Sequence, residues 1–239
     1  MSLSKTAEKP AESRPGRGRP REFDRELALR HALRLFWEQG YMQTTMSQLC
    51  RAMGIKSPSL YCAFGSKAEL FLEALAFYKA TYWGPVFARY LAEKNLYEAT
   101  KNLFASTARI LLSPDAPCGC LTVFSALTLP AREEGILATI AKMRADTRQV
   151  FRERLKMAVR DKEIEPDCDI PAITGSLTNY FEGLTLQARE QDICQAELLA
   201  IALRGVKLLP EPLEKGHGKP GESPKERPGA EARPRAHVG

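Results

Sequence analysis

Three side chains between residues 45 and 67 are suited to holding a phosphate group: Thr45, Tyr61 and Lys67. The hydroxyls can donate hydrogen bonds to phosphate oxygens, and the Lys67 ammonium supplies positive charge. Lys67 also follows Ser66, a typical N-cap, so the free backbone N–H groups of a helix start would face the same place. The alternative is that Tyr61 packs between helices, Lys67 is merely solvated and Thr45 only caps a helix.

Four further side chains could meet base edges if a duplex lay along this segment, namely Lys56, Ser57, Ser59 and Cys62. Lys56 is long enough to reach the O6 and N7 acceptors of guanine, whereas Ser59 is short and unselective. In the alternative interpretation, Lys56 meets phosphate and Ser57 only caps a helix.

A short basic sequence, Arg17-Gly18-Arg19-Pro20, precedes this segment. It resembles the core of an AT-hook, in which an extended Arg-Gly-Arg lies along a narrow A·T minor groove. Arg17 and Arg19 would then add minor-groove contacts to a major-groove reader, as the arms of homeodomains do. The alternative is a flexible basic tail that attracts DNA without sequence preference.

Cys118 and Cys120 could form a thiol or metal sensor. A tetrahedral zinc site needs four ligands, and the sequence has only three histidines, two of them beyond residue 210. A buried free cysteine behaves as a small apolar residue, which is the interpretation we favour, with a thiol- or metal-responsive switch as the alternative. No metal site is predicted.

Catalytic residues are not predicted either. The sequence contains no phosphate-binding loop, no GxSxG motif and no histidine evidently paired with a cysteine. We therefore expect a binding protein that is not an enzyme and that needs no cofactor.

Helix start and stop signals place the candidate residues on two short helices within about residues 45–64. Thr45 is a typical N-cap, and Gln48, three positions later, completes a capping box. Gly54 marks the end of this first helix, because glycine enters the left-handed conformation without a Cβ clash.

The second short helix follows at once. Ser57 is its predicted N-cap and Pro58 its first helical residue, where the missing N–H costs nothing. Gly65 ends it, and Ser66 with Glu69 form the capping box of the next helix. Two short helices joined by a glycine turn are typical of a helix-turn-helix.

The whole chain is predicted to be all-α, with about nine helices, because no segment alternates with the period of a strand. We expect a disordered basic arm over residues 1–21, a three-helix DNA-binding domain over 22–82, a helical domain over 83–210 and a disordered tail over 211–239. A fourth helix, about Ser66 to Trp83, would join the two domains and end at Gly84-Pro85. The helices expected around and beyond these cover about residues 24–39, 85–112, 118–129, 133–161, 170–189 and 193–208.

The positive charge of the chain is concentrated on the predicted helix-turn-helix segment and the arm before it. Residues 1–67 carry 12 Lys/Arg and 6 Asp/Glu, whereas residues 68–210 carry 17 and 18. Such clustering favours nucleic acid as the partner. No apolar run approaches the ~20 residues of a membrane span, so we expect a cytoplasmic protein without a membrane partner.

About ten positions at fixed spacing make residues 22–82 similar to the TetR/AcrR family of transcriptional regulators. The matching residues are Gly40-Tyr41, Thr44-Thr45, Leu49, Gly54, Ser57, Leu60-Tyr61, Phe64, Ser66-Lys67 and Leu70. Beyond residue 82 the resemblance lies only in the number and length of the helices.

The resemblance implies a homodimeric repressor that binds a palindromic double-stranded DNA operator and leaves it when a small-molecule inducer binds the C-terminal domain. It also implies that the last two helices, about residues 170–208, pair into a four-helix bundle. Aromatic residues could line the inducer cavity within the second domain, although aromatics at helical spacing are more often core. The candidates are Phe77, Trp83, Phe87, Tyr90, Phe104 and Phe124. A non-specific architectural DNA-binding protein is a further alternative.

Overall fold

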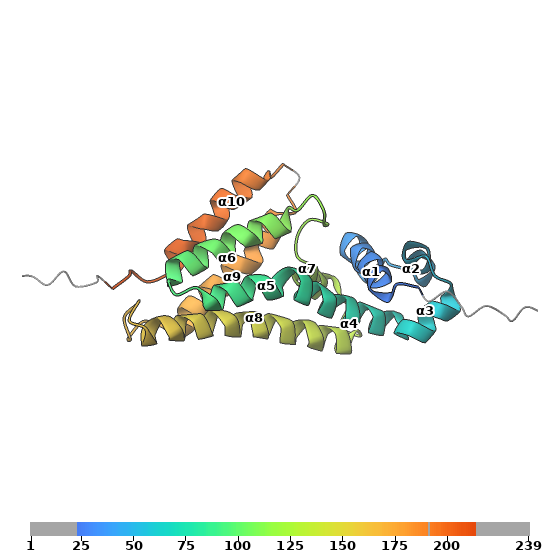
Figure 1. Cartoon of the computed structure of the whole chain (residues 1–239), viewed down its shortest axis with the longest axis horizontal. Coiled ribbons are helices and arrows are strands. Elements are labelled where there is room, and N and C mark those ends of the chain that lie inside the picture. The colour runs from blue at the N-terminus through green and yellow to red at the C-terminus, as the bar shows by residue number, and fades with distance from the viewer. Residues whose placement is uncertain (1–22, 191, 214–239) are drawn as a thin grey trace, which may run out of the picture.

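The computed structural model of the chain describes residues 23–190 and 192–213, and these residues are all helical or irregular (Figure 1). The predicted all-α class is therefore confirmed. Ten α-helices follow one another, with a π turn at Lys79–Trp83 and a short 3₁₀ helix at Gly205–Leu208. The α-helices are α1 (Arg25–Gln39), α2 (Met46–Met53), α3 (Ser57–Phe64), α4 (Lys67–Tyr78), α5 (Gly84–Ala92), α6 (Leu96–Leu111), α7 (Leu121–Thr128), α8 (Glu134–Arg160), α9 (Ile170–Gln187) and α10 (Gln195–Arg204).

Helices α1–α3, which we call the head, lie at one end of the molecule, and α4 runs from the head into the other helices (Figure 1). The long α8 lies alongside α4 and α5, and α6, α9 and α10 pack at the far end (Figure 1). Side chains of α1–α4 meet in the interior of the head, where Phe36, Leu49, Leu60 and Leu70 are completely buried.

The predicted caps of the helix-turn-helix are mostly confirmed. Thr45 and Gln48 form the capping box of α2, Gly54 adopts a left-handed φ of 67°, and Ser66 with Glu69 form the capping box of α4. The prediction for Ser57 is wrong by one residue: Lys56 is the N-cap of α3, and Ser57 is its first helical residue without a capping hydrogen bond. The helix starts earlier because the Leu60 amide already donates to the Lys56 carbonyl.

The boundary predicted at Gly84-Pro85 coincides with the start of α5, but the chain stays helical there, since it passes from α4 into α5 through the π turn. The Gly84 amide donates to the Lys79 carbonyl five residues back. Pro85 falls in the first turn of α5, where the fixed φ of proline is compatible with a helix. The long helical region predicted beyond this point is instead divided, because α5 ends at Ala92 and α6 begins at Leu96.

Trp37 joins the head to the rest of the molecule. Its indole N–H donates to the Gly119 carbonyl, 3.2 Å away on the segment before α7. Its ring also packs edge-to-face on Tyr78 and Tyr82, with centroid distances of 4.8 and 5.1 Å. One continuous cluster of buried apolar side chains therefore extends from the head into the second part of the chain.

A buried ion pair holds the end of α8 to the start of α6. Arg154 of α8 is 1% exposed, and its guanidinium lies 2.9 Å from a Glu163 carboxylate oxygen. Glu163 also accepts a hydrogen bond from the Leu96 amide at the start of α6. The pair thus fixes the turn after α8 against a second helix.

Candidate nucleic-acid interface and ligand cavity

The outer face of α3 carries the side chains that the sequence nominates as base readers. An α-helix has about 3.6 residues per turn, so Leu60 and Phe64, which are four positions apart, lie on the same face of α3. Both side chains are buried. Lys56, the N-cap of α3, is exposed, as are four residues of α3 whose side chains can donate a hydrogen bond. Those four are Ser57, Ser59, Tyr61 and Cys62.

The junction of α3 and α4, which we call the α3–α4 corner, brings together two of the three predicted phosphate-binding side chains. Tyr61 is 51% exposed at the end of α3, and Lys67 is the first residue of α4. The Lys67 ammonium lies 4.3 Å from the centroid of the Tyr41 ring. Burial lowers the pKa of Lys67, while the negative charge of Glu133 at the start of α8 acts in the opposite direction.

Thr45 is engaged by its own helix. Its hydroxyl lies 2.8 Å from the Gln48 side-chain oxygen and 3.2 Å from the Gln48 amide, which donates to it. The hydroxyl proton is therefore directed at Gln48 and is not free for a phosphate in this conformation.

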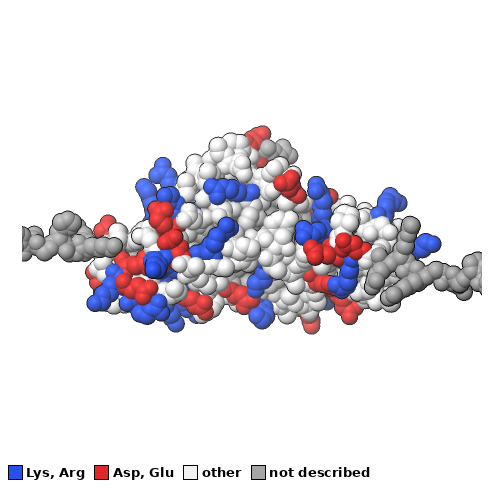
Figure 2. Space-filling view, viewed as in Figure 1, with Lys and Arg blue, Asp and Glu red and all other residues white. Residues whose placement is uncertain are grey.

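Arg51 is a candidate that the sequence reasoning missed. Three other arginines of the head lie in ion pairs: Arg25 with Glu73, Arg30 with Glu26 and Arg34 with Glu38. Within the described part of the head and the first turn of α4, the cations outside such pairs are Arg51, Lys56 and Lys67. Arg51 is exposed in the last turn of α2, and its place beside Gly54 at the helix-turn-helix is the signal that could have found it. Figure 2 shows Lys and Arg side chains at the head end of the molecule.

The proposed minor-groove residues Arg17 and Arg19, the arm over residues 1–21 and the tail beyond residue 213 lie outside the described residues.

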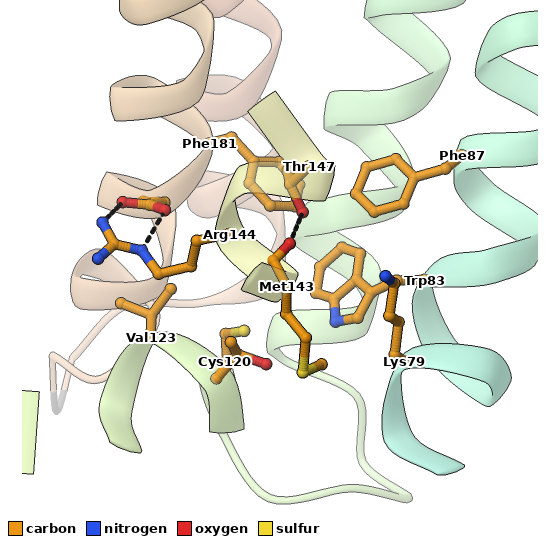
Figure 3. A pocket seen from close by; sticks show the side chains of 11 residues that line it. Lys79, Trp83, Phe87, Cys120, Val123, Met143, Arg144, Thr147 and Phe181 are labelled. Atoms are coloured by element: carbon orange, nitrogen blue, oxygen red, sulfur yellow. Dashed lines mark hydrogen bonds and ion pairs between the residues drawn. The ribbon is translucent and has the colours of Figure 1, made fainter. Parts of the chain in front are cut away.

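A cavity, which we call the central cavity, lies among α5, α7, α8, α9 and the π turn (Figure 3). Of the six predicted aromatics, Trp83 and Phe87 line it, and sequence reasoning missed the third, Phe181 of α9. The other lining residues are Lys79, Cys120, Thr122, Val123, Met143, Arg144, Thr147 and Glu182.

The other four predicted aromatics do not line the central cavity. The Phe77 ring lies under the Arg30 guanidinium, the Phe104 ring packs edge-to-face on Tyr180, and the Phe124 ring lies under the Arg189 guanidinium. Tyr90 is buried against Phe151 and borders a separate groove between α5 and α6. Helical spacing did not distinguish these core and surface positions from cavity walls.

Cys118 and Cys120 differ in their surroundings. Cys118 is exposed, whereas Cys120 is 6% exposed and its sulfur lies 3.2 Å from the Tyr78 hydroxyl. Burial raises the pKa of the Cys120 thiol, which disfavours the reactive thiolate. Within the described residues, no three His, Cys, Asp or Glu side chains are grouped as metal ligands would be.

We expect Cys120 to resist alkylation in the native protein. Iodoacetamide should modify it at least about tenfold more slowly than Cys118, because a buried thiol is both shielded and protonated. Mass spectrometric mapping over time measures the two rates, and a denatured sample, in which both should react alike, is the control. Equal native rates would favour the thiol-switch alternative.

No helix in the described ranges is long and apolar enough to cross a bilayer.

Comparisons with known proteins agree with this arrangement. The family model of the bacterial regulatory proteins of the tetR family matches residues 28–74. The HTH-type transcriptional repressor ComR of Escherichia coli (strain K12) is 32% identical over 196 residues, which cover 82% of this chain and 93% of ComR. The uncharacterized HTH-type transcriptional regulator YezE of Bacillus subtilis (strain 168) is 28% identical over 72% of this chain and 89% of its own length.

A solved structure is similar over almost the same range. The TetR family transcriptional regulator CifR, as a cysteine mutant in complex with 26-bp double-strand operator DNA, is 33% identical, with a TM-score of 0.76. The match covers 80% of this chain and all of CifR. The capped helix-turn-helix, the all-helical architecture and these relatives establish that the chain belongs to the TetR family of DNA-binding transcriptional regulators, which are not enzymes.

Proposed function

We propose that this chain is a homodimeric repressor that leaves a palindromic operator when a small molecule enters the central cavity. The observation that carries the DNA-binding half of the proposal is the exposed polar face of α3 beside the basic α3–α4 corner. Lys56 and Ser59 would face base edges, while Tyr61 and Lys67 would hold the backbone. ComR is named a repressor and the CifR complex contains operator DNA, which supports both the partner and the sign of regulation.

A dimer is supported by the outward face of α9. Small or apolar residues are exposed or half-exposed along it at intervals of three and four. They are Ala172, Gly175, Ser176, Asn179, Gly183 and Leu186. Small side chains allow a second helix to approach closely, and two-fold pairing of α9 and α10 would place both copies of α3 on one side of the dimer. The two recognition helices would then meet successive major grooves ~34 Å apart.

We expect Gly183→Arg to convert the dimer into a monomer without unfolding it. A Cβ at Gly183 meets no atom within 4 Å, so the subunit accommodates the new side chain, but a paired helix would not. Gly135→Arg is the matched control, because Gly135 is also helical and also has nothing within 4 Å. Size-exclusion chromatography with light scattering gives the mass of each variant. A dimeric Gly183→Arg variant would contradict this interface.

The cavity is connected to the head through the π turn. Lys79 and Trp83, the first and last residues of that turn, both line the cavity. Lys79 also pairs with Asp146 of α8, with its nitrogen 2.6 Å from the carboxylate. A ligand that favours a different position of Trp83 would therefore shift α4, whose first residue is Lys67. The inducer acts only through its different affinity for the two conformations.

Binding to the DNA upstream of the chain's own gene tests the regulatory function. Fluorescence anisotropy should give a much lower Kd for that fragment than for a scrambled fragment of equal length at the same salt concentration. Equal affinities for the two fragments would instead favour the non-specific architectural protein.

A further inference from the structure

We propose that the central cavity takes a small, flat, uncharged aromatic molecule. This inference rests on the proposed function, because it names the chemical class of the ligand that would release the DNA. Four observations lead to it: the aromatic walls, the paired charges, the engaged hydrogen-bonding groups and a flexible methionine that can make room in a small cavity.

Three aromatic rings form one corner of the cavity (Figure 3). The Trp83 and Phe87 rings are stacked with an interplanar angle of 25° and centroids 6.0 Å apart. Phe181 meets Trp83 edge-to-face at 5.1 Å. Such a corner offers both a ring face and a ring edge, and a further aromatic ring is stabilised by each such contact beyond its buried area.

Both cations at the cavity already have carboxylate partners. Lys79 pairs with Asp146 at 2.6 Å, and Arg144 forms two hydrogen bonds to Glu182 at 2.8 and 2.6 Å (Figure 3). An anionic ligand would meet each of these cations with a carboxylate beside it, and a cationic ligand would meet each carboxylate with a cation beside it. A charged ligand would therefore lose its hydration without gaining a free counterion, which is costly.

Two hydrogen-bonding groups at the cavity are engaged within the protein. The Thr147 hydroxyl donates to the Met143 carbonyl of its own helix at 3.2 Å. The Cys120 thiol is paired with the Tyr78 hydroxyl, and burial keeps this thiol protonated by raising its pKa. A ligand rich in hydroxyl or amide groups would therefore leave several of them unsatisfied.

The cavity is small in this conformation. It encloses about 40 Å³ of free space, far less than the ~300–1,000 Å³ of typical ligand sites, so a ligand ring enters only if a side chain moves aside. The Met143 side chain extends into it between Cys120 and Trp83 (Figure 3). Because methionine is unbranched and flexible, its thioether can move aside and then pack on the ligand ring.

The groove between α5 and α6 provides an internal comparison. It is larger, with about 430 Å³ of free space, but its walls carry Arg89, Arg109, Asn102 and Ser106 rather than an aromatic corner. We do not expect an uncharged aromatic molecule to bind there.

Three probes with the same ring system and different charges test the proposal: naphthol, naphthoate and naphthylmethylamine. Isothermal titration calorimetry at about pH 7 with the full chain should show that naphthol binds at least about tenfold more tightly than either charged probe, because only the charged probes must bury an uncompensated charge. Tightest binding by naphthoate or by the amine would overturn the ligand class, and so would the absence of binding by all three.

Two variants test the position of the site. Val123→Trp, which fills the central cavity, should abolish naphthol binding, whereas Ser106→Trp in the α5–α6 groove should leave the affinity unchanged. Thermal unfolding verifies that each variant is folded, and Thr147→Trp replaces Val123→Trp if that variant is not. Unchanged naphthol affinity in a folded cavity-filling variant would overturn the placement. Operator binding by the ligand-free wild type is measured separately, so a wrong ligand class is distinguishable from a wrong function.

Discussion

Lys67→Ala is expected to weaken operator binding by the proposed dimer about thirtyfold in ~0.15 M salt. Each phosphate contact through a cation contributes ~0.9 to the slope of log K against log salt. The substitution is present in both subunits, so two contacts are lost and the slope should flatten by ~1.8. The thirtyfold loss follows from that slope if counterion release supplies the whole free energy of the contact. Anisotropy titrations at several salt concentrations give both quantities.

Two other variants define what the Lys67 result means. Tyr61→Phe should weaken binding to all sequences but leave the salt slope unchanged, because the lost phenol is uncharged. Lys156→Ala removes an exposed lysine in the second half of α8 and should change neither quantity. An unaltered slope for Lys67→Ala would show that this ammonium, which lies over the Tyr41 ring, serves the packing of the corner and not the DNA.

Arg154→Ala is expected to lower the free energy of unfolding by about 3–5 kcal/mol, because it leaves the Glu163 carboxylate without its partner in a buried place. For a chain of this size, the corresponding fall in Tm is about 6–20 °C. Differential scanning calorimetry at a fixed protein concentration measures it, since the Tm of a dimer depends on concentration.

The double variant Arg154→Met/Glu163→Gln should recover most of this loss. It removes both charges together, and the side-chain oxygen of the introduced glutamine can still accept from the Leu96 amide. Arg160→Ala is the control on the same helix: its pair with Asp161 has side-chain exposures of 68% and 48%, so its removal should change stability by less than about 1 kcal/mol. An Arg154→Ala variant as stable as this control would refute the assigned role of the buried pair.

The sequence predicted best what is determined locally. The capping boxes at Thr45 and Ser66 and the left-handed Gly54 depend on residues at most three positions apart, so the limits of α2 and the start of α4 could be read directly. The start of α3 was displaced by one residue, because Ser and Lys are both compatible with the turn and only the backbone hydrogen bond distinguishes them.

The central cavity could not be predicted in the same way. Its walls come from helices that are distant in sequence, and Phe181 of α9 meets Trp83 only because α9 packs on α8. Trp83 and Phe87 were named among six equivalent-looking aromatics, since helical periodicity records which residues are apolar and not which of them border a void. The π turn has no sequence signature beyond Gly84-Pro85, which was interpreted as a break.

The hydrogen bond from the Trp37 indole to the Gly119 carbonyl has a consequence for engineering chimeric regulators. A graft that transferred only residues 22–82 to another regulator would leave Trp37 facing a foreign surface and would cut the chain inside the π turn. The transplantable unit is therefore discontinuous in sequence: it comprises the head, α4 with the whole turn through Trp83, and the short segment around Gly119. DNA specificity in this protein is thus better changed by exchanging the exposed side chains of α3 than by exchanging the head as a module.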